Sequence, residues 1–409
     1  TWLSPWWVKY ANTIWMDGYD HSWADVPSIS RRDAAITYRD MVLYEDFKTK
    51  DLWFPIANLM THGIIKGHLQ RLGGEQEPLD KFTDNALLYF ARGVAMWELY
   101  ISPDILTDGE WDAIAGAYHW ARDRFPVLER TEMVGGDPNS REPYGYVHFL
   151  GAKGIVAARN PYIAAAAMKV ELSTVYGIDP DAKKLVLERV YPTRWISPKL
   201  YKAGSTVELE LDGYETAVYE IYPVDEAKWP LPAGVVFDVV STEGSECVIN
   251  LRTKTGKVKL LNPGVIEEMT SDGGAVKLNE LDLARGLSVE SAIDAKFEMF
   301  PGGVKVRIDL DEFAADARLA FLVEWTVEGE EIIQPEVEVI LNGAIVDAKM
   351  QGGKVPWAWY SVPVTRGSWE AEISVAPGEG ASELESMVTA WFVAGSEAEA
   401  VPVTCLLYT

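Results

Sequence analysis

The sequence predicts a mixed fold that is α/β in its first third and all-β in the rest. Strand-like and helix-like segments alternate up to about residue 133, and after Gly135-Gly136 short apolar runs between turn residues replace them. A Pro-rich segment at 228–232 then separates two all-β stretches. We therefore expect the C-terminal part of a (β/α)8 barrel over residues 1–134, a β-sandwich over 135–227 and a second β-sandwich, of jelly-roll type, over 228–409.

The barrel part is expected to contain three strand–helix units. The strands are predicted at 14–16, 52–56 and 96–101. The first helix is predicted to begin at Ser30, the second to run over 80–92, and the third to follow Thr107, which forms a capping box with Glu110. A closed barrel needs eight such units. Because the chain opens on an apolar segment that contains Trp2, Trp6 and Trp7, we expect an upstream segment or a companion chain to pack there.

The all-β part is indicated by short runs rich in β-branched and aromatic residues, which are bounded by turn residues. The strands of the first sandwich are expected within 144–159, 166–172, 185–191, 207–211 and 217–222. Those of the second are expected within 235–240, 248–252, 304–308, 319–325, 336–341, 369–375 and 388–393.

Composition limits the classes of ligand. The chain has 62 acidic and 37 basic residues and a formal net charge of −25, which argues against nucleic acid or an anionic membrane as partner. The 16 Trp and 18 Tyr fit either sugar stacking or ordinary core packing. No apolar run is long enough for a membrane span. Cys247 and Cys405 are far apart in sequence, so they pair with each other or stay as buried thiols.

Polar residues follow the predicted barrel strands, where parallel barrels carry their chemistry. These residues are Asp17, Asp20 and His21 after the first strand, Asn58, Thr61 and His62 after the second, and Ser102 and Asp104 after the third. Glycoside hydrolysis commonly uses two carboxyl groups on opposite sides of the sugar bond. Asp17 and Asp20 are too close in sequence to serve as both.

Each of these side chains also has a structural interpretation. One of the two aspartates acts as the acid/base, or Asp17 and Asp20 only shape a turn. His62 donates to a sugar hydroxyl, braces a catalytic carboxylate or is structural. No Cys/His spacing indicates zinc, and no Gly-rich loop indicates a phosphate site.

Three segments in order resemble the last strand regions of the retaining α-galactosidase and α-N-acetylgalactosaminidase barrels. Ile14-Trp15-Met16-Asp17-Gly18-Tyr19-Asp20 looks like the family's Q-I-W-T-S-D segment, 54–63 looks like its Y-P-x-x-x-M-G-A-H segment, and 93–99 looks like its G-x-F-G-Y-E-L segment. The segments 144–149 and 153–161 resemble the opening of the β-sandwich that follows such barrels. The resemblance covers about the first half of the chain.

The resemblance implies a retaining α-glycoside hydrolase for galacto- or N-acetylgalactosaminyl-type α-linkages. Gly18 occupies the family's acid/base position, so this role is expected for Asp20, or otherwise for Asp17. The family's nucleophile lies on an earlier strand that this sequence does not contain. Trp15, His62 and Glu98 would line or support the pocket. No cofactor is implied, the partner is an oligo- or polysaccharide, and we expect an extracellular or periplasmic location.

Two other classes remain open. The first is a non-catalytic carbohydrate-binding or structural surface protein that keeps the barrel scaffold. The second is a scaffold whose terminal sandwich binds polysaccharide. In the run 355–360, strand alternation puts Trp357 and Trp359 on one face, either exposed as a stacking platform or buried as core.

Overall fold

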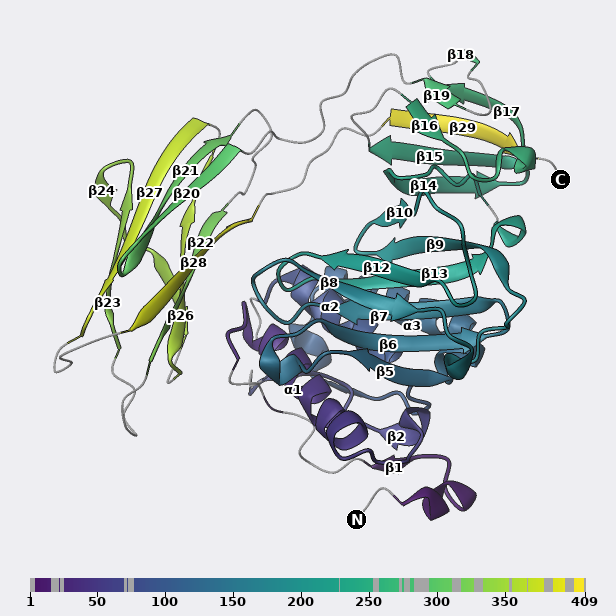
Figure 1. Cartoon of the computed structure of the whole chain (residues 1–409), viewed down its shortest axis with the longest axis horizontal. Helices are drawn as coiled ribbons and strands as arrows, with labels where there is room; N and C mark the ends of the chain where they lie inside the picture. Colours follow the sequence, from purple (N-terminus) through teal and green to yellow (C-terminus); the bar gives the residue numbers. More distant parts are fainter. Residues whose placement is uncertain are drawn as a thin grey trace. The chain divides into compact units, whose positions relative to one another are not determined.

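The computed structural model divides the chain into two compact units (Figure 1). The first contains residues 1–251, 256–284 and 401–409, and the second contains residues 252–255 and 285–400. The structure describes residues 4–15, 22, 26–69, 72, 77–227, 229–252, 257–271, 274–275, 280–282, 294–310, 318–326, 334–352, 355–365, 367–378, 385–393 and 401–407. In these residues no helix is long and apolar enough to cross a membrane.

The first 130 residues contain helices that alternate with short parallel strands. The helices are α1 (Arg31–Tyr44), α2 (Leu79–Ala91) and α3 (Asp108–Leu128), and the strands are β1 (Ile14–Trp15), β2 (Leu59–Met60), β3 (Ile64–Lys66) and β4 (Leu99–Ile101). β1 pairs in parallel with β2, and β3 pairs in parallel with β4. Consecutive strand segments are therefore neighbours in space, as in βαβ units.

The helix starts follow the capping signals. The Ser30 side chain accepts a hydrogen bond from the Asp33 amide over 3.1 Å, and α1 begins at Arg31, directly after Ser30. Thr107 and Glu110 form the reciprocal capping box of α3. The predicted caps of α1 and α3 are confirmed, because these bonds satisfy amide groups that have no partner inside the helix.

Two of the predicted strands lie elsewhere. Residues 52–56 do not form a strand. A 3-10 turn over Ile56–Asn58 follows Pro55, and the pairing starts only at Leu59. Pro55 has no amide hydrogen for a ladder bond, which accounts for the late start. The third strand is limited to Leu99–Ile101 instead of 96–101.

A large sheet forms the centre of the first unit. It contains twelve strands in the order β18-β17-β29-β15-β14-β10-β9-β13-β7-β6-β5, with β11 paired to β9. Its strands, in chain order, are Thr131–Gly135 (β5), Tyr144–Leu150 (β6), Lys153–Arg159 (β7), Lys183–Tyr191 (β9), Arg194–Ile196 (β10), Tyr201–Lys202 (β11), Thr216–Pro223 (β13), Val236–Glu243 (β14), Glu246–Arg252 (β15), Ile266–Ser271 (β17), Gly274–Ala275 (β18) and Val401–Leu407 (β29).

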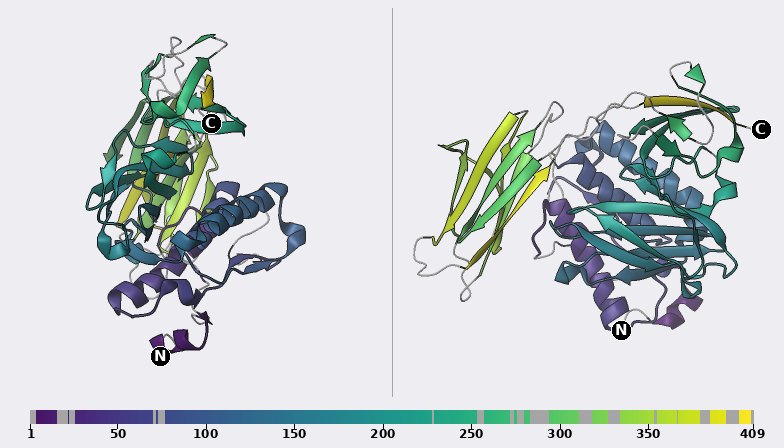
Figure 2. Two further views of the ribbon diagram at one scale, coloured as in Figure 1. Left: turned by 90° about the vertical axis from the view of Figure 1, so that its right-hand side faces the viewer. Right: turned by 45° about the horizontal axis from the view of Figure 1, so that its top comes forward.

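Strands β6 and β7 and the first half of β13 are buried on both faces. Tyr144, Tyr146 and Ile155 pack with the helices, which cover one face of the sheet (Figures 1 and 2). Val147 and Val156 face the other way, toward a two-stranded sheet of β8 (Ala166–Glu171) and β12 (Thr206–Leu211). The alternation of side chains along each strand produces these two cores.

Asp40 links α1 to the end of α2 by a buried ion pair and to the sheet by hydrogen bonds. Asp40 of α1 accepts hydrogen bonds from Arg92 (2.7 Å), Tyr144 (2.6 Å) and Tyr146 (2.6 Å). Burial is the main reason that the pKa values of both tyrosines lie well above 10, so both stay protonated donors.

The sheet continues beyond residue 228. β10 pairs with β14, and the strands that follow share a core with Val186, Ile196 and Leu231. The short strands β16 (Lys257–Lys259) and β19 (Glu280–Asp282) pair beside it. The range 228–409, expected as one domain, therefore contributes strands to both units, because β29 returns to lie between β15 and β17.

The second unit contains two sheets that share one core. The first sheet has the order β20-β21-β27-β23-β24, and the second has the order β25-β26-β22-β28. The strands are Asp294–Phe300 (β20), Gly303–Leu310 (β21), Arg318–Trp325 (β22), Glu336–Leu341 (β23), Ala344–Ile345 (β24), Lys349–Gly352 (β25), Trp357–Pro363 (β26), Gly367–Ala376 (β27) and Ser386–Val393 (β28).

The two cysteines lie on neighbouring strands. Cys247 of β15 and Cys405 of β29 are direct backbone partners in the antiparallel ladder. Cys247 is a buried free thiol, and burial raises its pKa. The fold thus brings together two positions that are distant in the sequence.

Candidate functional site

The parallel strands form two pairs that follow each other along the chain. Ile14 and Trp15 lie opposite Leu59 and Met60, and Ile64 to Lys66 lie opposite Leu99 to Ile101. Thr61 to Gly63 follow β2 and precede β3, so they lie at the carboxyl end of the first pair and at the amino end of the second.

Three aromatic rings meet where β2 leads into β3: Trp15 ends β1, His62 follows β2, and Tyr100 lies within β4. The Trp15 and His62 ring centroids are 5.9 Å apart with the planes at 68°, and those of His62 and Tyr100 are 5.2 Å apart with the planes at 45°. Trp15 is 50% exposed and Tyr100 is 44% exposed. The cluster is therefore fixed by ring–ring contacts on one side and open on the other.

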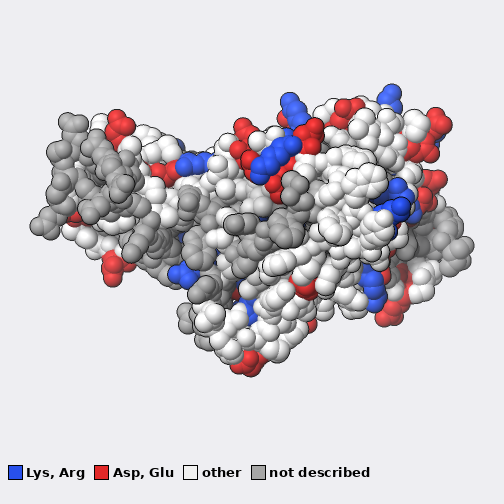
Figure 3. All heavy atoms as spheres, turned by 90° about the horizontal axis from the view of Figure 1, so that it is seen from below, with Lys and Arg blue, Asp and Glu red and all other residues white. Residues whose placement is uncertain are grey.

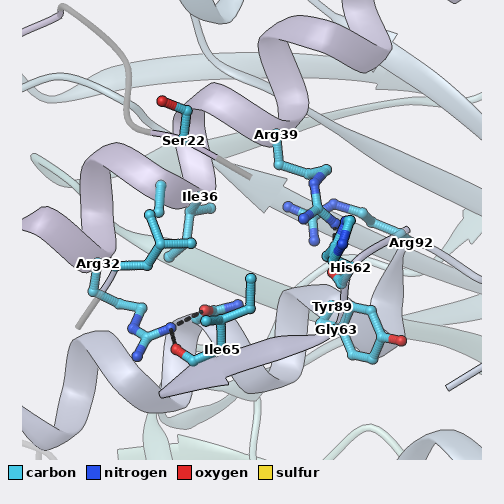
Figure 4. A pocket seen from close by; sticks show the side chains of 12 residues that line it. Ser22, Arg32, Ile36, Arg39, His62, Gly63, Ile65, Tyr89 and Arg92 are labelled. Carbon is cyan, nitrogen blue, oxygen red and sulfur yellow. Dashed lines mark hydrogen bonds between the residues drawn. The ribbon is translucent and has the colours of Figure 1, made fainter. Parts of the chain in front are cut away.

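Helix α1 fixes the backbone of His62. Arg39, which is almost fully buried, donates from Nη1 to the His62 carbonyl oxygen over 2.8 Å. In Figure 4, the Arg39 side chain extends from its helix toward His62. A charge-assisted hydrogen bond thus fixes the backbone that carries the histidine ring.

A small cavity lies beside this support. It is lined by Arg32, Arg39, Arg92, His62 and Tyr89 among others, and its volume is about 20 Å³. A volume of this size holds about one water molecule. A ligand larger than water does not fit in it, whereas Trp15 and Tyr100 expose ring surface outside it.

Glu98 lies directly beside the histidine segment. A Cβ atom on Gly63 would lie 1.7 Å from the Glu98 carbonyl oxygen, so only glycine permits this approach. The Glu98 amide donates to Tyr89 Oη over 2.9 Å, and that hydroxyl donates to the Met96 carbonyl over 3.2 Å. Burial raises the pKa of Tyr89 to about 12, which keeps this donor protonated at neutral pH.

The side chain of Glu98 has a buried oxygen without a partner. Its Oε2 has no hydrogen-bond partner within the part of the chain that the structure describes. A buried carboxyl oxygen normally accepts a hydrogen bond, and an unsatisfied one costs about 1–3 kcal/mol. Glu98 is therefore available to accept from a further group.

A second group of charges follows β3 and β4. His68 Nε2 is 3.3 Å from Asp104 Oδ2, and both side chains are exposed. Below them, buried Lys66 contacts Glu110 and lies 3.2 Å from Glu77, and Arg32 binds Glu77 over 2.8 Å. These buried pairs compensate one another and anchor β3 to the helices.

The structure brings some of the predicted site residues together and does not describe others. Trp15 and His62 are in ring contact, and Glu98 lies next to Gly63. Asp17, Asp20 and His21 lie outside the described residues.

The other residues predicted at strand ends are placed as follows. Asn58 precedes β2 instead of following a strand, and its Nδ2 donates to the Asn12 carbonyl over 2.6 Å. Thr61 is buried. Ser102 and Asp104 follow β4 as expected.

Sequence reasoning missed Tyr100, Arg39 and His68. Tyr100 lies two residues after Glu98 on the same predicted strand, so alternation could have placed the two on one face. Arg39 gives no such signal, because its role depends on the packing of α1 against the strand ends.

A larger cavity of about 290 Å³ lies at the opposite ends of the strands. It is lined by Pro55, Ala57, Asn58, Ala95, Glu129 and Arg130. Pro55 to Asn58 precede β2, and Ala95 precedes β4, so this cavity is at the amino ends. Residues at that end of parallel βα architectures contribute to stability rather than chemistry.

The charge distribution and the donor groups limit the ligands. Figure 3 views the molecule from the side on which β1 and β2 are labelled in Figure 1, and large areas of this face carry no charged side chain. Among the described residues, no group of three or more His, Cys, Asp and Glu side chains is arranged to hold a metal ion. An uncharged ligand suits such a surface.

Taken together, the fold is mixed α/β and all-β, with an aromatic cluster of Trp15, His62 and Tyr100 where β2 leads into β3. No family model and no curated protein matches the sequence. Among solved structures, the chain is similar to an α-amylase from Geobacillus thermoleovorans complexed with acarbose, at 14% identity and a TM-score of 0.30 over 48% of this chain and 45% of that chain.

Two further similar structures are enzymes of related type. The α-amylase AmyB from Thermotoga neapolitana has 13% identity and a TM-score of 0.27 over 47% of this chain and 46% of that chain. The γ-CGTase from alkalophilic Bacillus clarkii has 10% identity and a TM-score of 0.28 over 89% and 57%. The chain spans about half the length of these structures. Similarity at these identities and TM-scores does not establish a family or an activity.

Proposed function

We propose that the chain is the C-terminal part of a retaining α-glycoside hydrolase for galacto- or N-acetylgalactosaminyl-type α-linkages. The observation that carries the proposal is the contact of Trp15, the last residue of β1, with His62, which follows β2, and of His62 with Tyr100 of β4. In the sequence, Asp17 and Asp20 follow Trp15, the last residue of β1, within five residues. The parallel pairing of consecutive strand segments supports a barrel end.

In this proposal the aromatic cluster binds the sugar and one aspartate transfers the proton. Trp15 and Tyr100 offer exposed ring surface to the C–H face of a pyranose. Asp20, or alternatively Asp17, protonates the leaving oxygen and later removes a proton from the attacking water. Glu98, with a carboxyl oxygen that lacks a hydrogen-bond partner among the described residues, accepts from a sugar hydroxyl or orients His62.

The second carboxylate belongs to a preceding segment or a companion chain in this proposal. Among the described residues β1 pairs with β2 alone, and the rings of Trp6 and Trp7 are exposed; both observations support a partner here. Retaining hydrolysis places the nucleophile about 5–5.5 Å from the acid/base. Such an enzyme needs no cofactor, and we propose that it acts in the extracellular space or the periplasm.

The role of Asp20 is tested by its leaving-group dependence. In the complete enzyme, Asp20→Ala should lower kcat/KM about 100-fold or more on a phenyl α-galactoside, but much less on a dinitrophenyl α-galactoside. The reason is that an acidic leaving group needs little protonation. Asp17→Ala is the matched control. An equal loss on both substrates, or a larger loss from Asp17→Ala, would move the role away from Asp20.

The substrate class is tested on the same preparation. Aryl α-galactosides and α-N-acetylgalactosaminides should be cleaved faster than aryl α-glucosides and maltooligosaccharides. Preferential cleavage of the glucosides would contradict the galacto-type assignment while leaving the hydrolase assignment intact.

A non-catalytic carbohydrate-binding protein is the second candidate. The exposed rings of Trp15 and Tyr100 favour it, because stacking alone needs no carboxylate. This candidate predicts sugar binding that Trp15→Ala weakens and Asp20→Ala leaves unchanged, with no hydrolysis of any aryl glycoside.

A further inference from the structure

The two cysteines of the chain lie opposite each other in the large sheet. Cys247 of β15 and Cys405 of β29 are direct partners in an antiparallel ladder that joins residues 246–251 to residues 401–406. The ladder runs through both positions without a shift of register. Because the chain contains only two cysteines, a disulfide within one chain can join only these two.

The backbone register sets the distance that such a disulfide has to span. The Cα atoms of directly opposed residues in an antiparallel ladder are about 4.5–5.5 Å apart, and their Cβ atoms lie on the same side of the sheet. Disulfides join cysteines whose Cα atoms are about 4.4–6.8 Å apart. Cys247 and Cys405 can therefore be joined while β15 and β29 keep their ladder.

Both positions lie on the core-facing side of the sheet. Cys247 is fully buried and shares a core with Ile249, Leu251 and Met269. Met269 of β17 is the other ladder partner of Cys405, so position 405 lies between two residues of this core. A soluble reductant has poor access to a disulfide in such a place, which slows thiol–disulfide exchange once the sheet has formed.

The same two strands lead into and out of the inserted unit. A bond between Cys247 and Cys405 closes a loop of residues 248–404, which contains both parts of the second unit, 252–255 and 285–400. Closing so long a loop removes many conformations from the unfolded chain, whereas the folded ladder already holds the two positions together. The bond therefore favours the folded sheet at the place where β29 returns to it.

We propose that Cys247 and Cys405 form a disulfide under oxidising conditions and that this bond fastens the returning strand β29 to β15. The oxidant is a small-molecule disulfide such as oxidised glutathione. One protein thiolate attacks it and releases a first small thiolate, and the second protein thiolate attacks the mixed disulfide and releases the other. The protons of the two protein thiols pass to the released thiolates, so one protein disulfide forms while one small disulfide is reduced to two thiols. This inference does not depend on the proposed hydrolase site.

The burial of Cys247 determines when the bond forms. Burial raises the pKa of this thiol, so little thiolate is present in the folded sheet. Because the thiolate is the species that attacks a disulfide, we expect the bond to form while the chain folds, before the core around Cys247 is closed. The oxidant is therefore supplied during refolding in the experiment below.

The test is refolding of the 409-residue chain from urea into a mixture of oxidised and reduced glutathione. After alkylation of free thiols and digestion without reductant, mass spectrometry should find the peptide of Cys247 joined to the peptide of Cys405. The disulfide form should melt about 5–10 °C above the same chain refolded in reductant. Cys247→Ala and Cys405→Ser are the matched variants, and each should melt at the same temperature after both treatments.

Three results would overturn the proposal. One is a chain refolded with glutathione in which both cysteines are alkylated or bound to glutathione. Another is a bond between the cysteines of two chains, which non-reducing electrophoresis detects as a dimer. The third is a disulfide form that melts no higher than the reduced form, because the bond would then not fasten β29. All three readouts use the unsubstituted chain, so they remain decisive if a variant fails to fold.

Discussion

His148 shows how burial controls a single titratable residue in this chain. It lies on β6, fully buried, with Nδ1 2.8 Å from the Leu128 carbonyl oxygen at the end of α3. Burial lowers its pKa from 6.5 to about 4. The imidazole is therefore neutral in the folded state at pH values where it is partly charged in the unfolded chain.

This difference predicts a loss of stability in acid. Because the folded-state pKa lies below the unfolded one, the contribution is complete above pH 6.5 and declines as the pH falls toward 4. The free energy of unfolding at pH 4.5 should fall by about 2.5 kcal/mol more in the parent chain than in His148→Gln. Urea unfolding at pH 7.5 and 4.5 measures this difference. His119→Gln, which changes an exposed histidine of α3, should behave like the parent.

Local sequence signals predict the positions of some site residues, whereas tertiary packing determines the contacts of the others. The positions of Trp15, His62 and Glu98 near strand ends could be predicted, because a strand end is a local property of the sequence. The hydrogen bond from Arg39 to the His62 carbonyl could not, because it joins α1 to a segment 23 residues later. The contact between Tyr100 and His62 depends on the β3–β4 register, which no local pattern specifies.

At the scale of elements, the close approach of two strand segments depends on one glycine. Gly63 lies against the Glu98 carbonyl, where a Cβ atom would overlap backbone and not a movable side chain. Gly116 offers the opposite environment, in α3 with nothing within 4 Å of an added Cβ atom.

These two glycines give a matched pair of variants. Gly63→Ala should lower the free energy of unfolding by about 2–3 kcal/mol, because it forces the strand segments apart. Gly116→Ala should raise it by about 0.5–1 kcal/mol, since alanine has the higher helix propensity and loses less backbone entropy. Thermal or urea unfolding of both variants tests this. Similar stability of Gly63→Ala and the parent would show that the approach is not as tight as the backbone geometry indicates.

At the scale of the whole molecule, the chain leaves the large sheet and returns to it. β17, β18 and β19 precede the strands of the second unit, and β29 follows them and pairs with both β15 and β17. The second unit is therefore an insertion between two strands of the first, and β29 completes a sheet that the chain begins more than 130 residues earlier.

This topology predicts a difference between two deletions. A chain that ends at residue 284 loses β29, so β15 and β17 each lose one neighbour and the sheet is interrupted between them; it should aggregate or unfold at a lower temperature. A chain in which a long flexible linker replaces residues 285–400 keeps β29, and its first unit should melt within about 5 °C of the parent. Size-exclusion chromatography and calorimetry compare the two. Equal behaviour of both deletions would mean that β29 contributes little to the sheet.

The sequence by itself determined what depends on nearest neighbours along the chain. It determined the capped starts of α1 and α3, the change from α/β to all-β near residue 135, the alternation that faces strand residues to opposite sides, and the aromatic and polar residues at the strand ends. Caps, turns and hydrophobic periodicity depend on residues that are close together in the chain, so they can be predicted from the sequence.

Only the tertiary structure decided which distant segments meet. It decided that the sheet continues past residue 228, that β29 returns across an inserted unit, and that Asp40 joins two tyrosines and an arginine. The physical reason is that strand pairing and buried ion pairs depend on closing long loops, whose free-energy cost varies only slowly with their length. Many strand pairings therefore have a similar loop-closure cost, and burial of the shared core determines which pairing forms.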